Sequence, residues 1–133
     1  MQRLTHPGPV AEGRLHRVVC RARPLVLRLR GGLALDRAVA AALADAGVQA
    51  GYLRPADLPL AALAWVIPAV SAPGNPRVAW FSDTRRAAGG MIVAGGLHLG
   101  AREGQAFCHC HGIWRDPQGA LHAGHLRTDE TVL

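Results

Sequence analysis

A chain of 133 residues and 14.0 kDa can bury one hydrophobic core without disulfides or a metal, so we expect one domain. Half of the residues are hydrophobic, but the longest apolar run, Leu58 to Val70, contains two prolines and is shorter than the ~20 residues of a membrane-spanning helix. These properties exclude a membrane protein and a disulfide-dependent miniature fold. Residues 1–13 are polar and lack a signal-peptide pattern. We therefore expect a flexible segment over 1–13, a domain over 14–133, and a cytoplasmic location.

The cysteines favour the same compartment. Their number is three, and Cys108 and Cys110 are too close in sequence for a usual structural bridge. Reduced thiols in a reducing compartment fit this pattern best.

The formal net charge is +6, and all fifteen basic residues are arginines. A clustered basic face is the signature of phosphate binding, so charge alone makes DNA a candidate partner. The densest cluster has no interleaved aromatic residues for base stacking and lies along two expected strands. It comprises Arg14, Arg17, Arg21, Arg23, Arg28 and Arg30. We favour biased, arginine-rich composition over selection for DNA as the explanation.

The first expected elements are two strands and a helix. Apolar and basic residues alternate over 14–20 and 24–30, which predicts strands with one buried face. The period changes over 33–47, where an alanine-rich stretch predicts a helix that ends at Gly47. Its apolar positions share one helical stripe: Leu35, Val39, Leu43 and Ala46.

After residue 48 the pattern is that of strands separated by turns rich in Pro, Gly, Asn and Asp. The expected strands are 48–54, 60–70, 77–82, 89–100, 105–115 and 120–127. The glycines of 89–100 precede neither Lys-Ser or Lys-Thr nor a helix, so they indicate bulges or close backbone approach rather than a phosphate loop. One helix among about eight strands joined by short turns predicts an α+β fold, a mostly antiparallel β-sheet with one main α-helix in one compact domain.

The segment FCHCHGIWRDPQGALHAGHL, residues 107–126, holds four of the seven histidines and two of the three cysteines. Its DPQG sequence predicts a type I turn with a left-handed Gly119, which makes a three-residue hairpin loop that pairs Asp116 with Ala120. A two-residue loop would shift the register by one and change which side chains are opposed. The glycine favours the three-residue loop.

That register places His111 opposite His125, with His109 one step along the same face. Opposed Cβ atoms lie about 5 Å apart and alternate residues of a strand about 6.5 Å apart, so the three imidazoles can reach one ion. Zn²⁺ suits imidazole, and another divalent metal is the alternative. Three histidines leave a fourth position open, as in catalytic zinc sites. The competing explanation is a set of ordinary strand histidines.

Other candidate ligands are weaker. Cys108, Cys110 and His122 share the opposite face, but the Cys-x-Cys spacing is unusual for structural zinc, so buried thiols are favoured. His98 is either a further ligand or, as we favour, a plain strand residue. A hydrolase also needs a general base, and the sequence directs none of the nearby carboxylates at the metal, so catalytic residues are unassigned. These carboxylates are Asp116, Asp129 and Glu130.

Residues 25–133 resemble the PPC (plant and prokaryote conserved) domain of small prokaryotic proteins and plant AT-hook proteins. The resemblance rests on PLVLRLRGG, on LDRAVAAALADAGV and, most specifically, on HCHGIWRDPQGALHAGHL. The last segment matches the family pattern of His-x-His, Asp-x-x-Gly and Gly-His-Leu. The matching positions are His109, His111, Asp116, Gly119, Gly124, His125 and Leu126.

The resemblance implies a compact α+β domain that forms a homotrimer through its sheets, with a metal on His109, His111 and His125. In plant members a separate AT-hook contacts DNA, and this chain has no Arg-Gly-Arg-Pro hook. Residues 55–84 lack the Gly-rich signature of plant domains, so plant-type partners are not transferred. The sequence ends at TDETVL, where the family would add one more strand, so either the domain is shortened or the chain is a piece of a longer protein.

Three functions follow as hypotheses. The first is a homotrimeric, cytoplasmic binding or regulatory module with a divalent metal. The second is a metal-dependent enzyme on a small or anionic substrate, with metal-bound water as nucleophile and arginines that steer the substrate. The third is a DNA-binding protein, favoured by charge alone.

Overall fold

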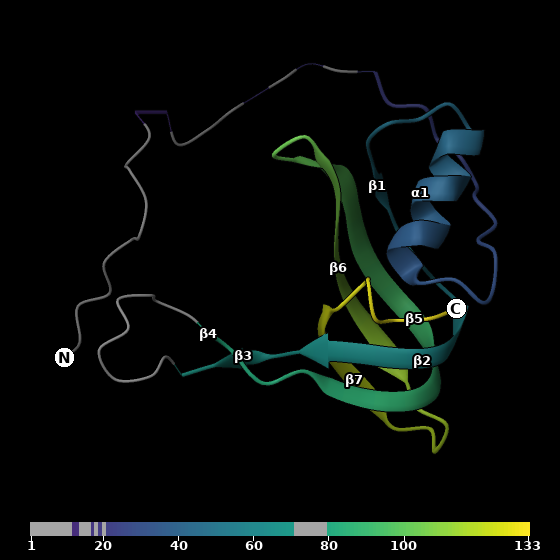
Figure 1. Ribbon diagram of the computed structural model, residues 1–133, viewed down its shortest axis with the longest axis vertical. Helices are drawn as coiled ribbons and strands as arrows, with labels where there is room; N and C mark the ends of the chain where they lie inside the picture. The colour runs from purple at the N-terminus through teal and green to yellow at the C-terminus, as the bar shows by residue number, and fades with distance from the viewer. Residues whose placement is uncertain (1–11, 14–16, 18, 20, 71–79) are drawn as a thin grey trace.

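The computed structural model describes residues 12–13, 17, 19, 21–70 and 80–133 (Figure 1). In these residues, one helix accompanies a five-stranded antiparallel sheet and a separate two-stranded one, which confirms the predicted α+β fold. The elements are α1 (Leu35–Asp45), β1 (Gly51–Leu53), β2 (Leu58–Val66), β3 (Pro68–Ala69), β4 (Trp80–Phe81), β5 (Arg85–Arg102), β6 (Gln105–Arg115) and β7 (Leu121–Leu126).

Four strands of the larger sheet close on themselves. The strand order is β1-β5-β2-β7-β6, and β6 also pairs with β5, so β5, β2, β7 and β6 form a small barrel. The length of β5 makes this possible, because its first half pairs with β2 while its second half pairs with β1 on the same edge. Its other edge pairs with β6 from Met91 to Arg102. The far end of the β5–β6 hairpin therefore projects beyond the barrel, beside α1 (Figure 1).

Helix α1 forms where the sequence predicts it and covers the inner face of the hairpin. Leu35, Val39 and Leu43 are buried in one core with residues of β2, β5, β6 and β7. Gly47, at φ +67°, donates its N–H to Ala44 O (2.9 Å), and Val48 donates to Leu43 O (2.8 Å). These two bonds close the helix C-terminus in a Schellman motif. In the described parts of the chain, no helix is long and apolar enough to cross a membrane.

The β6–β7 turn has the predicted geometry. Asp116 and Ala120 pair through an N–H to carbonyl bond of 3.0 Å, and Gly119, at φ +92°, donates its N–H to Asp116 O (3.0 Å). The Asp116 side chain adds a second layer, because its Oδ1 accepts the backbone N–H groups of Gln118 (3.0 Å) and Ala120 (2.8 Å). The three-residue loop is confirmed.

The glycines of β5 permit close contacts, as the sequence indicates, and the strand also contains a bulge beside them. The β5–β6 register shifts between Ile92 and Ala94. A Cβ atom on Gly95 would lie 2.9 Å from the carbonyl oxygen of His111, and one on Gly96 would lie 2.9 Å from the hydroxyl of Tyr52. Larger side chains at these two positions would therefore push β1 or β6 away from β5.

The C-terminal residues join the helix entry to the sheet. Val132 forms isolated bridges with Ala34 and Ala62, and its N–H donates to Ala62 O at 2.9 Å. Thr131 is fully buried, and its hydroxyl contacts both the N–H (3.3 Å) and the carbonyl oxygen (3.2 Å) of Ala64. This segment positions α1 over the core.

The expected strand over 24–30 is wrong. Leu27 and Leu29 do pack against the core while Arg28 and Arg30 are exposed, so the alternation is real, but the segment pairs with no strand among the described residues. Alternating burial needs only an extended chain on an apolar surface, whereas a strand also needs a partner edge. The expected strand over 14–20 and the flexible segment over 1–13 lie mostly outside the described residues.

Further boundaries differ. Of the expected strand 48–54, only Gly51–Leu53 is observed as a strand. The expected strand 60–70 divides into β2 and β3, with a break at Ile67 before Pro68. Only Trp80–Phe81 of the strand 77–82 is observed, since 77–79 lie outside the described residues. Strand β5 begins at Arg85, because Arg85 pairs with Trp65 on the neighbouring strand β2. The sequence DTRRA, expected as a turn, is therefore a turn only in its first residues.

Candidate metal centre

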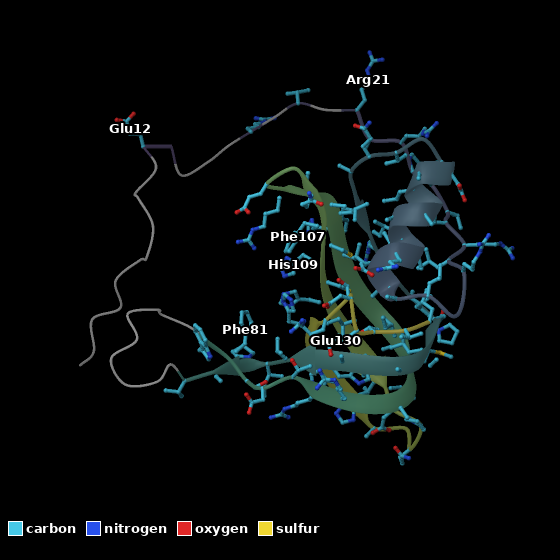
Figure 2. All side chains as sticks on the ribbon, in the orientation of Figure 1. Glu12, Arg21, Phe81, Phe107, His109 and Glu130 are labelled. Atoms are coloured by element: carbon cyan, nitrogen blue, oxygen red, sulfur yellow. The ribbon has the colours of Figure 1, made fainter. Side chains whose placement is uncertain are left out.

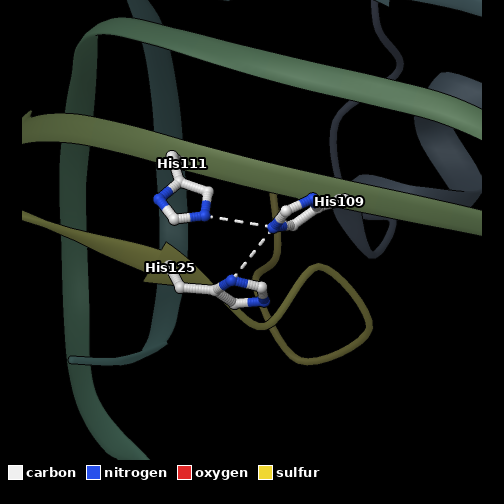
Figure 3. A group of neighbouring side chains, drawn as sticks. All are labelled: His109, His111 and His125. Carbon is white, nitrogen blue, oxygen red and sulfur yellow. Dashed lines mark hydrogen bonds between the residues drawn. The ribbon is translucent and has the colours of Figure 1, made fainter. Parts of the chain in front are cut away.

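Three histidines from two neighbouring strands converge on the outer face of the β6–β7 pair (Figure 3). His111 is directly opposite His125, as the turn predicts, and His109 lies two residues before His111. His109 Nε2 is 3.2 Å from His125 Nδ1 and 3.0 Å from His111 Nε2. One nitrogen of each ring lies within 4.8 Å of the others, so the three residues are close enough to hold one metal ion.

Two of the three nitrogen pairs have the spacing expected around a tetrahedral ion. Two nitrogens that are each 2.0–2.1 Å from a tetrahedral zinc are about 3.3 Å apart, close to both short contacts. Hydrogen bonding accounts for them less well, because His109 Nε2 carries either one proton or one lone pair and can make one directed bond. A cation could accept a lone pair from all three rings.

The electrostatics of the site favour the neutral form of His109 and His125. Burial, followed by the nearby His111 and His98, lowers the pKa of His109 below its ordinary 6.5. Burial also lowers the pKa of His125, with smaller effects from His109, His111 and Arg127. Neutral rings keep the lone pairs that a metal requires.

Aromatic side chains flank the three histidines. Phe81 of β4 contacts His125 with ring centroids 5.5 Å apart, and Phe107 lies 6.3 Å from His109. Figure 2 shows Phe81, Phe107 and His109 on one side of the sheet. The two-stranded β3–β4 arm thus brings Phe81 to the site from a distant part of the sequence.

His98 lies beside this group but outside it. It pairs with His109 across β5 and β6, with ring centroids 6.5 Å apart. Its ring is closer to Tyr52, at 4.8 Å. Among the described residues the group that could share one ion is formed by His109, His111 and His125.

A hollow of about 300 Å³ adjoins His111. It exists because small residues meet on β5, β6 and β7, among them Ala94, Gly112, Ala123 and Gly124. His111 itself is exposed, whereas His109 and His125 are partly buried. The exposed side of the group is therefore open to water or a small molecule.

The opposite face of β6 does not form a second ligand group. Cys110 is fully buried and Cys108 is partly buried, and burial raises their thiol pKa values to about 12 and about 11. His122 instead contacts Asp116, with Nε2 2.8 Å from Oδ2. The two cysteines are core residues, as the sequence favours.

The three candidate carboxylates form ion pairs with residues outside the group of His109, His111 and His125. Asp116 pairs with His122, and Asp129 pairs with Arg127 at 3.2 Å. Glu130 also pairs with Arg127, at 3.1 Å. In the described residues these carboxylates therefore stabilise turns and surface contacts, and none is placed as a base beside the histidines.

The arginine cluster lies at the surface where it is described. Arg14 is outside the described residues, and the remaining five members are exposed. The Arg23 guanidinium donates a hydrogen bond to Ala46 O at 3.3 Å, at the end of α1. Arginines must be exposed to contact phosphates, but arginines with no partner other than water are exposed as well. The exposure therefore does not distinguish the two cases, and DNA binding stays a prediction from charge.

Two features of this region were not predicted from the sequence. Phe81 reaches His125 through the β3–β4 arm, for which no local pattern gives a direction. The Asp116–His122 pair could have been found, because the predicted register places His122 opposite Trp114 beside the turn. A scan against protein-family models, a search of curated proteins and a search of solved structures found no match to the chain.

Proposed function

We propose that this protein is a small module that binds one divalent metal ion, preferably Zn²⁺, through His109, His111 and His125. The observation that carries the proposal is the convergence of three imidazole nitrogens within 4.8 Å on one sheet face. Imidazole is a preferred zinc ligand, and three histidines with an open position form a common zinc arrangement.

The residues of the site would divide the task. His109 is the central ligand, because its Nε2 is close to both other rings. The Asp116–Gly119 turn holds the register that opposes His111 and His125. Bound zinc would supply a Lewis acid and an acidified water at its open position.

The assembly we propose is a homotrimer of PPC type that acts as a binding or regulatory module. It is supported by the sequence resemblance and by apolar residues left exposed beside the histidines, on the same outer face: Met91 (42%), Ile113 (45%) and Leu121 (59%). A trimer would have three times 14.0 kDa, or 42 kDa. Light scattering should give that mass, and Leu121→Arg should reduce it.

A thermal shift experiment tests the metal proposal. Zinc at a hundredfold excess over its Kd stabilises the folded state by about 2.7 kcal/mol, which raises Tm by about 10 °C in a domain of this size. The His109, His111 and His125 to Ala triple variant should lose this response, and His122→Ala should retain it. An equal response in the wild type and the triple variant would exclude the site.

A zinc-dependent enzyme is the second candidate. The open side of the histidine group and the hollow beside His111 favour it, because both give a small substrate room at the metal. It predicts turnover of ester, phosphate or amide substrates that a chelator abolishes and Zn²⁺ restores. A screen that finds no chelator-sensitive turnover would argue against the enzyme and in favour of the binding module.

A further inference from the structure

A second cavity lies on the other side of the hairpin, against the β6–β7 turn. Its volume is about 340 Å³, and its walls come from β2, from the start of β5 and from the turn residues Asp116, Pro117 and Gln118. None of the three metal-candidate histidines lines it. Its chemistry is therefore separate from that of the histidine group.

One wall of the cavity is aromatic. The rings of Trp65 and Trp114 meet edge to face with centroids 5.1 Å apart, and both line the cavity. His122 stacks on Trp114 at 5.9 Å and 20°. Leu63 and Ala88 complete the apolar lining. Trp114 is 1% exposed and Trp65 is partly buried, so Trp65 supplies most of the aromatic surface that a ligand could contact. This surface favours a flat apolar ring, because aromatic groups prefer edge-to-face or offset contacts.

The volume sets the size of the ring system. An apolar cavity of about 150 Å³ holds benzene. The cavity here is about 340 Å³, which gives room for two fused rings. It also lies within the usual range for small-molecule sites, about 300–1,000 Å³.

The polar edge of the cavity is a histidine with a fixed partner. Asp116 Oδ2 lies 2.8 Å from His122 Nε2, while Oδ1 accepts the N–H groups of Gln118 and Ala120. An ionised carboxylate only accepts hydrogen bonds, so Nε2 of His122 donates its N–H to Asp116. In the tautomer with one proton, on Nε2, Nδ1 of His122 can accept a hydrogen bond from a ligand.

We propose that this cavity binds a small bicyclic heteroaromatic molecule that packs against Trp65, next to the buried Trp114, and donates a ring N–H to His122. Indole is the simplest molecule of this class and serves as the probe. The proposal does not depend on a metal at His109, His111 and His125, so each proposal can be tested without the other.

The test is a titration followed through the indole N–H signals of the protein in a ¹⁵N-correlated NMR spectrum. The three tryptophans are Trp65, Trp80 and Trp114, and Trp80, in β4, does not line the cavity. Indole should shift the Trp65 and Trp114 signals saturably and leave Trp80 in place. The absence of a saturable shift at millimolar indole, or an equal shift at Trp80, would overturn the proposal.

A matched pair of ligands isolates the hydrogen bond. 1-Methylindole lacks the N–H donor and should bind the wild type about 3- to 10-fold more weakly than indole, the usual contribution of one hydrogen bond. In His122→Phe, which keeps an aromatic ring over Trp114, the two ligands should bind equally. A preference for indole that survives in His122→Phe would refute the role of His122. Ala88→Phe should block both ligands, and undiminished binding there would place the ligand elsewhere.

Discussion

Both faces of strand β6 carry residues of metal-ligating types, histidines on one face and cysteines on the other, in very different surroundings. On the outer face, His111 Nε2 and His125 Nδ1 lie 3.0 Å and 3.2 Å from His109 Nε2. On the inner face, Cys108 and Cys110 lie under α1 in the core. Neighbouring residues of one strand thus alternate between a possible ligand and a packing residue.

The difference indicates that the same kind of burial acts in opposite directions on an imidazole and on a thiol as metal ligands. Burial lowers the pKa of His109, which keeps its ligand form, but raises the pKa of Cys110 to about 12, which suppresses the thiolate that a metal needs. The same desolvation therefore prepares one face for a cation and disables the other.

The largest expected effect is on metal affinity. Replacing His111 by Ala removes one of three ligands and should weaken zinc binding by more than the roughly 10- to 100-fold that loss of an outer-shell partner costs. Replacing His122 by Ala, on the opposite face, should leave the Kd unchanged. Competition with a chromophoric chelator measures both values, and equal losses would erase the distinction between the two faces.

Thiol reactivity should differ by about a hundredfold. The pKa of Cys108 is about 11 against an ordinary 9.0, so near pH 8 its thiolate fraction is roughly a hundred times smaller than in the unfolded chain. In a Cys20→Ser background, Ellman's reagent should react at least that much more slowly with the native protein than with protein in urea. Rates within a few-fold of each other would show that the inner face is open.

A pair of serine substitutions compares adjacent positions directly. Cys110→Ser places a hydroxyl in the apolar core and should lower the free energy of unfolding by about 1–3 kcal/mol. His111→Ser changes an exposed side chain and should alter it by no more than about 0.5 kcal/mol in metal-free protein. Urea denaturation measures both changes, and a larger loss for His111→Ser would contradict the assignment of the two faces.

The smallest effect is a dependence of stability on pH. Because folding lowers the pKa values of His109 and His125 below 6.5, the unfolded chain binds more protons just below that pH. The contribution of these residues is present in full above pH 6.5 and is lost as the pH falls towards their folded values. Metal-free wild type should lose more Tm between neutral pH and about pH 5.5 than a His109→Asn, His125→Gln variant. Parallel curves would contradict the pKa directions.

Local sequence signals were sufficient for the hairpin and the helix. Asp116, Pro117 and Gly119 specify a turn whose length fixes the register, and that register alone opposes His111 and His125. The stripe that ends at Gly47 specifies α1 in the same way. In both cases the decisive interactions are between residues close in sequence, so a local pattern in one sequence is enough to predict them.

Contacts between distant segments could not be predicted in this way. Closure of the barrel depends on the pairing of Trp65 and Val66 with Leu126 and His125, and this pairing also builds the tryptophan-lined cavity. No short-range pattern encodes that contact. Leu27 and Leu29 illustrate the opposite error, because an alternating pattern was present without a partner strand.

The most direct test of the metal centre is the metal content of untagged protein purified without chelator. The wild type should contain about one zinc ion per chain, and the His109, His111 and His125 to Ala triple variant should contain none while remaining folded. Absence of metal from both proteins, or an equal amount in both, would contradict the assignment of these histidines as ligands.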